Sequence, residues 1–339
     1  MTKLIQQFSF GGLMRKPETG SFLGLLAVFV FFSIFGGDNF FSFTGAASWL
    51  NVAGSLGIVA IPIGLLMIAG ELDLSIGSLI PAGSMTVAII SGHFGVSIIV
   101  GILVALALGA VIGFINGQLV VRTAVPSFIV TMGTLFAVAG LVLGLSVVIT
   151  GTTSVAIKAP PEAKWLFGHF IGGAYQVIIL WWVAIALIFA WVLHVSRFGN
   201  WIFAMGGDKL SARNAGIPTE KLTTILYMVS GMSATFVGVC QAILYNNAQV
   251  SAGQSYIFNA IISVVVGGVL LTGGYGSVFG IVLGTMTFAI VNQGIYFTSF
   301  DANWASLIIG VLLLLAVLMN NTFRRLALAY TPAKGKIAS

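Results

Sequence analysis

The stretch "MIAGELDLSIGS", residues 67–78, places Glu71 and Asp73 between long apolar runs in a chain that has only eight carboxylates. Charged side chains are costly inside a membrane and usually mark a function there. Two neighbouring carboxylates could form an acid–base pair, bind an ion or make a structural contact. Residues two apart point to different faces of a helix but to one face of an extended segment. A converging catalytic pair is therefore disfavoured if the segment is helical.

The sequence lacks the residue patterns that bind metals or ATP. The single cysteine, Cys240, excludes an internal disulfide, and His93, His169 and His194 lie far apart with no HExxH or CxxC spacing. A metal enzyme is therefore not expected. No G-x-x-x-x-G-K-[ST] sequence is present, so the chain cannot bind ATP through a P-loop. We expect no cofactor in this chain.

The composition indicates an integral membrane protein. Hydrophobic residues make up 58% of the 339 residues and charged residues 6%, against about 25% charged in a soluble domain. Long apolar runs favour an all-α polytopic fold of about ten spans over a barrel. The sixteen residues of 256–271 rise only about 24 Å, so that segment is expected to be broken or re-entrant. The apolar segments fall near 21–36, 49–69, 76–91, 97–120, 125–148, 176–195, 222–245, 256–271, 277–296 and 304–320.

The basic residues predict the orientation. If the N-terminus is cytoplasmic, all but two of the fourteen lysines and arginines lie on the inner side, and only Lys158 and Lys164 lie outside. This bias accounts for the net charge of +6 without a nucleic-acid partner. It predicts a cytoplasmic segment 1–20, a transmembrane domain 21–320 and a cytoplasmic basic tail 321–339.

The polar inner loop 197–221 is a candidate docking element. A break at Gly206-Gly207, a cap by the Asp208 carboxylate and Gly216 at the far end predict a short helix from Lys209 to Ala215. The loop is either a solvated connection or a helix that fits a groove on a cytoplasmic partner. The candidate coupling residues are Gly206, Gly207, Asp208, Lys209, Arg213 and Gly216.

The opening stretch has a structural interpretation as well as a functional one. Asp73 can cap the third span by accepting from the amides of Ser75 or Ile76, near the membrane boundary. The alternative for Glu71, Asp73 and Ser75 is a gate or a coupling contact, with Arg122 or the inner loop as the partner.

Amide side chains inside apolar segments are candidates for a polar translocation path, because they bind hydroxyl groups without a charge. Contacts between helices are the alternative for each of them. Trp49, Tyr245 and Trp304 lie near span ends, where anchoring at the membrane interface is favoured over contact with a solute. The path candidates are Asn116, Gln118, Gln241, Asn246, Asn247, Asn259, Asn292 and Gln293.

Four motifs in order resemble the permease subunits of bacterial ribose-type sugar ABC importers, over about residues 45–320. They are "GELDLSIGS" from Gly70, Asn116-Gly117 followed by "VPSFIVTMGT", "GGDKLSARNAGI" from Gly206, and "VVVGGVLLTGGYGSVFG" from Val264. The third looks like that family's ATPase-contacting loop. This chain has Asn259 in "IFNAIIS" where the family often has an acidic residue, and Ser211 where it often has alanine.

The resemblance implies an importer-type ABC transmembrane domain in a bacterial inner membrane, with both termini cytoplasmic. It implies pairing with a second copy or paralogue, two partner ATPase subunits or domains that bind ATP and Mg, and a soluble extracytoplasmic sugar-binding protein. The chain would then be a transport subunit for a monosaccharide or related polyol, not an enzyme.

Two other functions stay open on the residues alone. An ion-gradient-driven secondary transporter would continue uptake after ATP depletion. An intramembrane enzyme using Glu71 and Asp73 would show turnover by the purified chain and a paired acid–base geometry.

Overall fold

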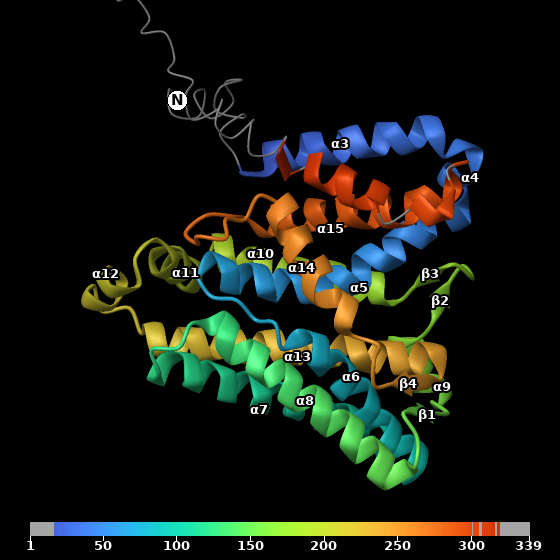
Figure 1. Ribbon diagram of the computed structural model, residues 1–339, viewed down its shortest axis with the longest axis horizontal. Helices are drawn as coiled ribbons and strands as arrows, with labels where there is room; N and C mark the ends of the chain where they lie inside the picture. Colours follow the sequence, from blue (N-terminus) through green and yellow to red (C-terminus); the bar gives the residue numbers. More distant parts are fainter. Residues whose placement is uncertain (1–16, 300, 305–306, 316, 319–339) are drawn as a thin grey trace, which may run out of the picture.

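The computed structural model describes residues 17–299, 301–304, 307–315 and 317–318, and these are predominantly helical (Figure 1). The predicted segments 1–20 and 321–339 lie wholly or largely outside the described residues. The principal helices are α3 (Pro17–Phe35), α4 (Gly37–Phe41), α5 (Phe43–Ile68), α6 (Ile76–Val87) with the π-helix η1 (Ala88–His93), α7 (Ile98–Arg122), α8 (Ser127–Thr150), α9 (Pro161–Phe167), α10 (Ile178–His194), α11 (Arg197–Gly207), α12 (Lys209–Asn214), α13 (Thr219–Tyr245), α14 (Gln254–Val266) and α15 (Val278–Gly294). Short 3₁₀ turns, η2 (Ile295–Phe297) and η3 (Ala302–Trp304), follow α15, and residues 307–315 and 317–318 are helical.

The all-helical membrane fold is confirmed, with fewer long spans than ten among the described residues. Seven helices there are long and apolar enough to cross a membrane, or eight if α10 and α11, which meet at 71°, form one bent span. At 13 residues, α14 rises about 20 Å and is too short for a membrane of ~30 Å, as expected for 256–271. The predicted span 304–320 lies partly outside the described residues.

Helix ends follow local capping chemistry. The Ser42 hydroxyl accepts from the Gly45 amide at the start of α5, and the Ser277 hydroxyl accepts from the Gly280 amide at the start of α15. The C-terminal end of α13 is at Asn246, which adopts a left-handed conformation with φ +53°. These signals lie within a few residues of the ends they set.

Small residues let the central helices approach closely. A Cβ on Gly113 of α7 would overlap the Tyr227 carbonyl of α13, and one on Gly83 of α6 would overlap the Thr235 carbonyl. Close backbone contact of this kind supplies the packing that holds membrane helices together. The helix α5 is buried along most of its length and lies at the centre of the bundle.

The bundle has two distinct ends (Figure 1). One end carries α11 and α12, and we call it the α12 end. The other carries α9, the antiparallel pair β1 (Ser154–Ala156) with β4 (Asn247–Gln249), and the hairpin β2 (Phe170–Ile171) with β3 (Tyr175–Gln176). We call it the α9 end. The breaks between helices at residues 69–75 and 267–277 lie beside α11, at the α12 end.

Candidate functional site

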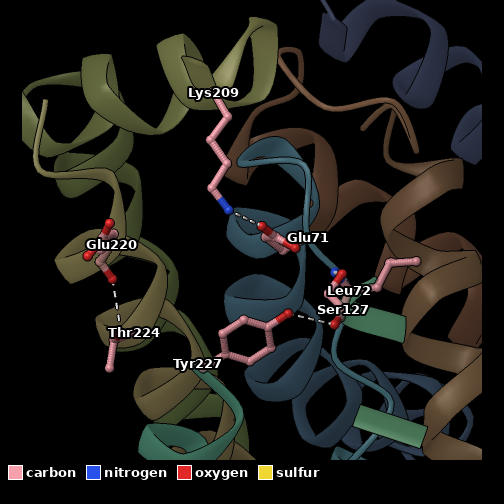
Figure 2. Close-up of polar contacts among 7 residues, drawn as sticks. All are labelled: Glu71, Leu72, Ser127, Lys209, Glu220, Thr224 and Tyr227. Carbon is pink, nitrogen blue, oxygen red and sulfur yellow. Dashed lines mark hydrogen bonds and ion pairs between the residues drawn. The ribbon is translucent and has the colours of Figure 1, made fainter. Parts of the chain in front are cut away.

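The extended segment 69–75, which joins α5 to α6, is the most connected polar feature at the α12 end. Its backbone bonds side chains from two other helices. The Leu72 carbonyl accepts from the Tyr227 hydroxyl at 2.9 Å, and the Leu72 amide donates to the Ser127 hydroxyl at 3.2 Å (Figure 2). The Leu74 amide donates to the Thr131 hydroxyl at 3.1 Å. These bonds satisfy a non-helical backbone that would otherwise be buried without partners.

Asp73 is the buried centre of this segment. Its carboxylate accepts from the Ser75 amide at 3.0 Å, the Ser75 hydroxyl at 2.6 Å and the Ser230 hydroxyl of α13 at 2.7 Å. The Ser75 amide is one of the two donors that the capping hypothesis named. The side chain is buried among protein atoms, with only 1% of its surface exposed. Three hydrogen bonds offset part of the desolvation cost that burial imposes on a carboxylate.

The Asp73 network reaches two further helices. Asn116 of α7 donates to the Ser75 hydroxyl at 2.9 Å, and Thr134 of α8 donates to the Asn116 side-chain oxygen at 2.6 Å. The chain Asp73–Ser75–Asn116–Thr134, with Ser230, therefore ties α6, α7, α8 and α13 to one carboxylate. Cooperative polar networks of this kind hold helices in a fixed relative arrangement.

Glu71 faces a different partner. Its carboxylate lies 2.6 Å from the ammonium of Lys209, the first residue of α12 (Figure 2). The inner loop, one of the two partners considered for this stretch, thus makes the contact. Arg122, the other, makes no ion pair in the part of the chain that the structure describes. Because Glu71 and Asp73 bond different elements, they do not form a converging acid–base pair.

Backbone contact reinforces the Glu71–Lys209 pair. A Cβ on Gly206 of α11 would overlap the Ile68 carbonyl at the end of α5 and the Gly274 amide, and that amide donates to the Ile68 carbonyl at 2.8 Å. Gly273 packs against Gly70, which has φ +87°. The predicted break at Gly206-Gly207 is wrong, since α11 continues through both residues. Gly206 permits close approach, and the chain turns at Asp208.

The short helix of the inner loop forms as its sequence indicates. The Asp208 carboxylate caps α12 by accepting from the Ser211 amide, and Gly216 follows with φ +84°. Hydrogen bonds from the Ser211 side chain and backbone hold the pKa of Asp208 below its usual value. Arg213 lies 3.2 Å from Glu220, but both side chains are exposed and the pair stabilises little. We call α12, segment 69–75 and the adjoining contacts of Gly206 and Gly273 the coupling junction.

A polar cavity of about 340 Å³ lies nearer the α9 end, among α5, α13, α14 and α15. Three predicted path residues line it, namely Gln241, Asn259 and Asn292. Gln241 donates to the Tyr256 hydroxyl at 2.8 Å. No lysine, arginine, histidine, aspartate or glutamate is among the residues that line this cavity. We call it the polar pocket.

The other predicted path residues lie elsewhere. Asn116 belongs to the Asp73 network, and Gln118 bonds the Thr224 hydroxyl at 3.1 Å between α7 and α13. Asn246 ends α13, and Asn247 in β4 accepts from Ser154 at 3.0 Å. Gln293 bonds its neighbour Asn292 at 2.8 Å, outside the pocket lining.

Sequence reasoning missed several residues of the polar pocket. Asn51 and Ser55 stand four residues apart within the apolar run of α5, and that spacing places them on one helix face. An amide and a hydroxyl on one face of an apolar helix are a signal that could have identified them. Tyr245, assigned to membrane anchoring, also lines the pocket, as does buried Cys240. The other polar lining residues not predicted are Gln176, Ser255 and Tyr256.

Comparisons with known proteins identify the family of this chain. Residues 45–317 match the family described as the permease component of branched-chain amino acid transport systems. The chain is 32% identical to the ribose import permease protein RbsC of Escherichia coli (strain K12), over 93% of this chain and 96% of that one. It is 28% identical to the fructose import permease protein FrcC of Rhizobium meliloti, over 93% and 88%. It is 31% identical to the inner membrane ABC transporter permease protein YjfF of Escherichia coli (strain K12), over 77% and 79%.

Proposed function

This chain belongs to the family of branched-chain amino acid transport system permease components, and we propose that it forms the membrane path of an ATP-driven importer for a monosaccharide or related polyol. It is a multi-pass membrane transport subunit and not an enzyme. Relatives named for ribose and fructose import support a sugar as the solute. The absence of charged side chains from the polar pocket supports an uncharged one.

The observation that carries this proposal is the ion pair between Lys209 and Glu71. It connects α12, which projects at one end of the bundle, with the break between α5 and α6. A partner that moves α12 would move segment 69–75 directly, through this pair and the Gly206 contact. Segment 69–75 then acts on α7, α8 and α13 through Asp73 and Leu72. Small shifts at an effector site become larger motions through packed contacts of this kind.

The coupling junction and the polar pocket lie near opposite ends of the same two helices, α5 and α13. Tyr227 at the junction and Gln241 at the pocket both belong to α13, and fourteen residues of helix rise about 21 Å. Likewise α5 carries Asn51 at the pocket and ends at the junction. Displacement of α5 and α13 at one end would therefore change the pocket at the other, which is the geometry that alternating access needs.

The partners follow from the same proposal. Two ATPase subunits or domains bind ATP and Mg and contact α12 on the cytoplasmic side. A second copy or a paralogue completes the path, and a soluble extracytoplasmic protein delivers the solute. The cationic residues at the α12 end, among them Arg122, Arg197 and Lys221, support a cytoplasmic position for that end. Both termini lie on the same side in this proposal.

The test is uptake of radiolabelled D-ribose and D-fructose into proteoliposomes that contain this chain, its ATPase and its binding protein. We expect uptake that requires ATP and persists when ion gradients are collapsed. Uptake that persists without ATP and stops when the ion gradient is collapsed would instead identify a secondary transporter.

A further inference from the structure

A second groove, of about 370 Å³, lies between α7 and α13 at the α12 end. Gln118 and Thr224 both line it, and the Gln118 amide donates to the Thr224 hydroxyl at 3.1 Å, which joins the two helices. One end of the groove is cationic, with Arg122 and Lys221. Glu220 also lines this end, and the apolar lining residues are Phe114, Val121, Ile225 and Met228.

The two cations have no acidic partner within the described part of the chain. The ion pairs found there join Lys209 to Glu71 and Arg213 to Glu220, and neither includes Arg122 or Lys221. Glu220 also lines the groove, but its carboxylate lies 3.2 Å from Arg213, which offsets its charge. Even with Glu220 counted, the two cations give the polar end of the groove a net positive charge.

The apolar wall continues from this cationic end toward the middle of the membrane. Phe114 lies eight residues before Arg122 on α7, a rise of about 12 Å. Phe114 and Ile225 are each about half exposed, so the wall is open to whatever lies beside the bundle. A cationic end at the span boundary and an apolar wall toward the membrane centre match the two parts of a phospholipid.

We propose that this groove binds an anionic phospholipid, with the lipid phosphate between Arg122 and Lys221 and an acyl chain along Phe114 and Ile225. Basic pockets between membrane helices bind anionic head groups through this combination of charge and apolar surface. The alternative is that Arg122 and Lys221 only extend their side chains to the membrane–water interface. That role would not require a groove between two helices. The bound lipid connects α7 with α13, the two helices that Gln118 and Thr224 also join, and it does so beside α12.

The experiment is native mass spectrometry of the purified full chain, titrated with phosphatidylglycerol and, separately, with zwitterionic phosphatidylcholine. The test variant is Arg122→Gln/Lys221→Gln. Its matched control, Lys158→Gln/Lys164→Gln, removes the same charge at the α9 end. We expect saturable binding of phosphatidylglycerol by the wild type and weaker binding of phosphatidylcholine. Affinity should fall about five-fold for each cation removed, hence about 25-fold in the test variant, with little change in the control.

Two results would overturn the proposal. Equal phosphatidylglycerol binding by the wild type and the test variant would do so, as would displacement of the lipid by inorganic phosphate, which would indicate a soluble-anion site. If the test variant binds lipid normally but no longer assembles with the partner ATPase, the groove is a contact site for that protein. The charge-preserving variant Arg122→Lys/Lys221→Arg should bind as the wild type does, which separates lost charge from misfolding.

Discussion

The Lys209 ammonium lies 2.6 Å from the Glu71 carboxylate, so the first residue of α12 is bonded to the segment that joins α5 and α6. The two residues are 138 positions apart in the sequence. The contact gives the loop that projects from the bundle a direct connection to the buried Asp73 network, two residues further along the chain.

Lys209→Glu and Glu71→Lys should each uncouple transport while leaving the chain folded. The Lys209 side chain is 43% exposed and that of Glu71 11%, so solvent screens the pair from the Lys209 side and its contribution to stability is about 1 kcal/mol. Its loss should lower ATP-driven uptake about five-fold or more, in line with typical coupling energies. The double variant Lys209→Glu/Glu71→Lys should recover uptake in proteoliposomes. Normal uptake by both single variants would exclude the pair from coupling.

Asp73→Ala should destabilise the protein much more than Asp73→Asn. Alanine leaves the Ser75 amide and the Ser75 and Ser230 hydroxyls without their acceptor, at about 1–3 kcal/mol for each buried group left unpaired. Asparagine keeps one oxygen toward Ser75 and can donate to the Ser230 hydroxyl. Thermal unfolding of the purified variants measures the difference. If both variants unfold at the same lower temperature, the negative charge itself is what the site requires.

Gly206→Ala should disturb the coupling junction, and Gly207→Ala provides the matched control. A Cβ at position 206 overlaps the Ile68 carbonyl and the Gly274 amide, whereas a Cβ at 207 meets nothing within 4 Å. We expect Gly206→Ala to cost about 1–3 kcal/mol of stability, as overpacking does, and to reduce ATP-driven uptake. Gly207→Ala should behave as the wild type in both assays. Matching behaviour of the two variants would contradict the backbone contact.

Asn259→Ala should weaken solute handling without lowering stability. Asn259 lines the polar pocket, and its side-chain amide has no hydrogen-bond partner among the described residues, so its removal leaves nothing unpaired. One lost neutral hydrogen bond to a solute corresponds to a rise in KM of about 2–10-fold. The control is Gln254→Ala, an exposed position on the same helix outside the pocket lining. An unchanged KM, measured as uptake against D-ribose concentration, would remove Asn259 from the path.

The sequence by itself determined the membrane class, the helical fold and the capped helix α12. These follow from signals that act over a few neighbouring residues. Apolar length predicts a membrane helix, and the Asp208 carboxylate caps α12 through an amide only three residues away. The motifs in order also identified the family, because each of them is contiguous in the chain.

Only the tertiary structure decided which partners the polar residues have. Glu71 and Asp73 stand together in the sequence, but their bonds reach Lys209 and Ser230, each more than 130 positions away. Gly206 resembled a helix break, but it lies within α11, where the backbone of Ile68 and Gly274 packs against it. Asn51 and Asn259 belong to one pocket although a single sequence gives no signal that α5 and α14 meet. Side-chain partners and backbone contacts across helices depend on packing between distant segments, which local propensity and hydropathy do not encode.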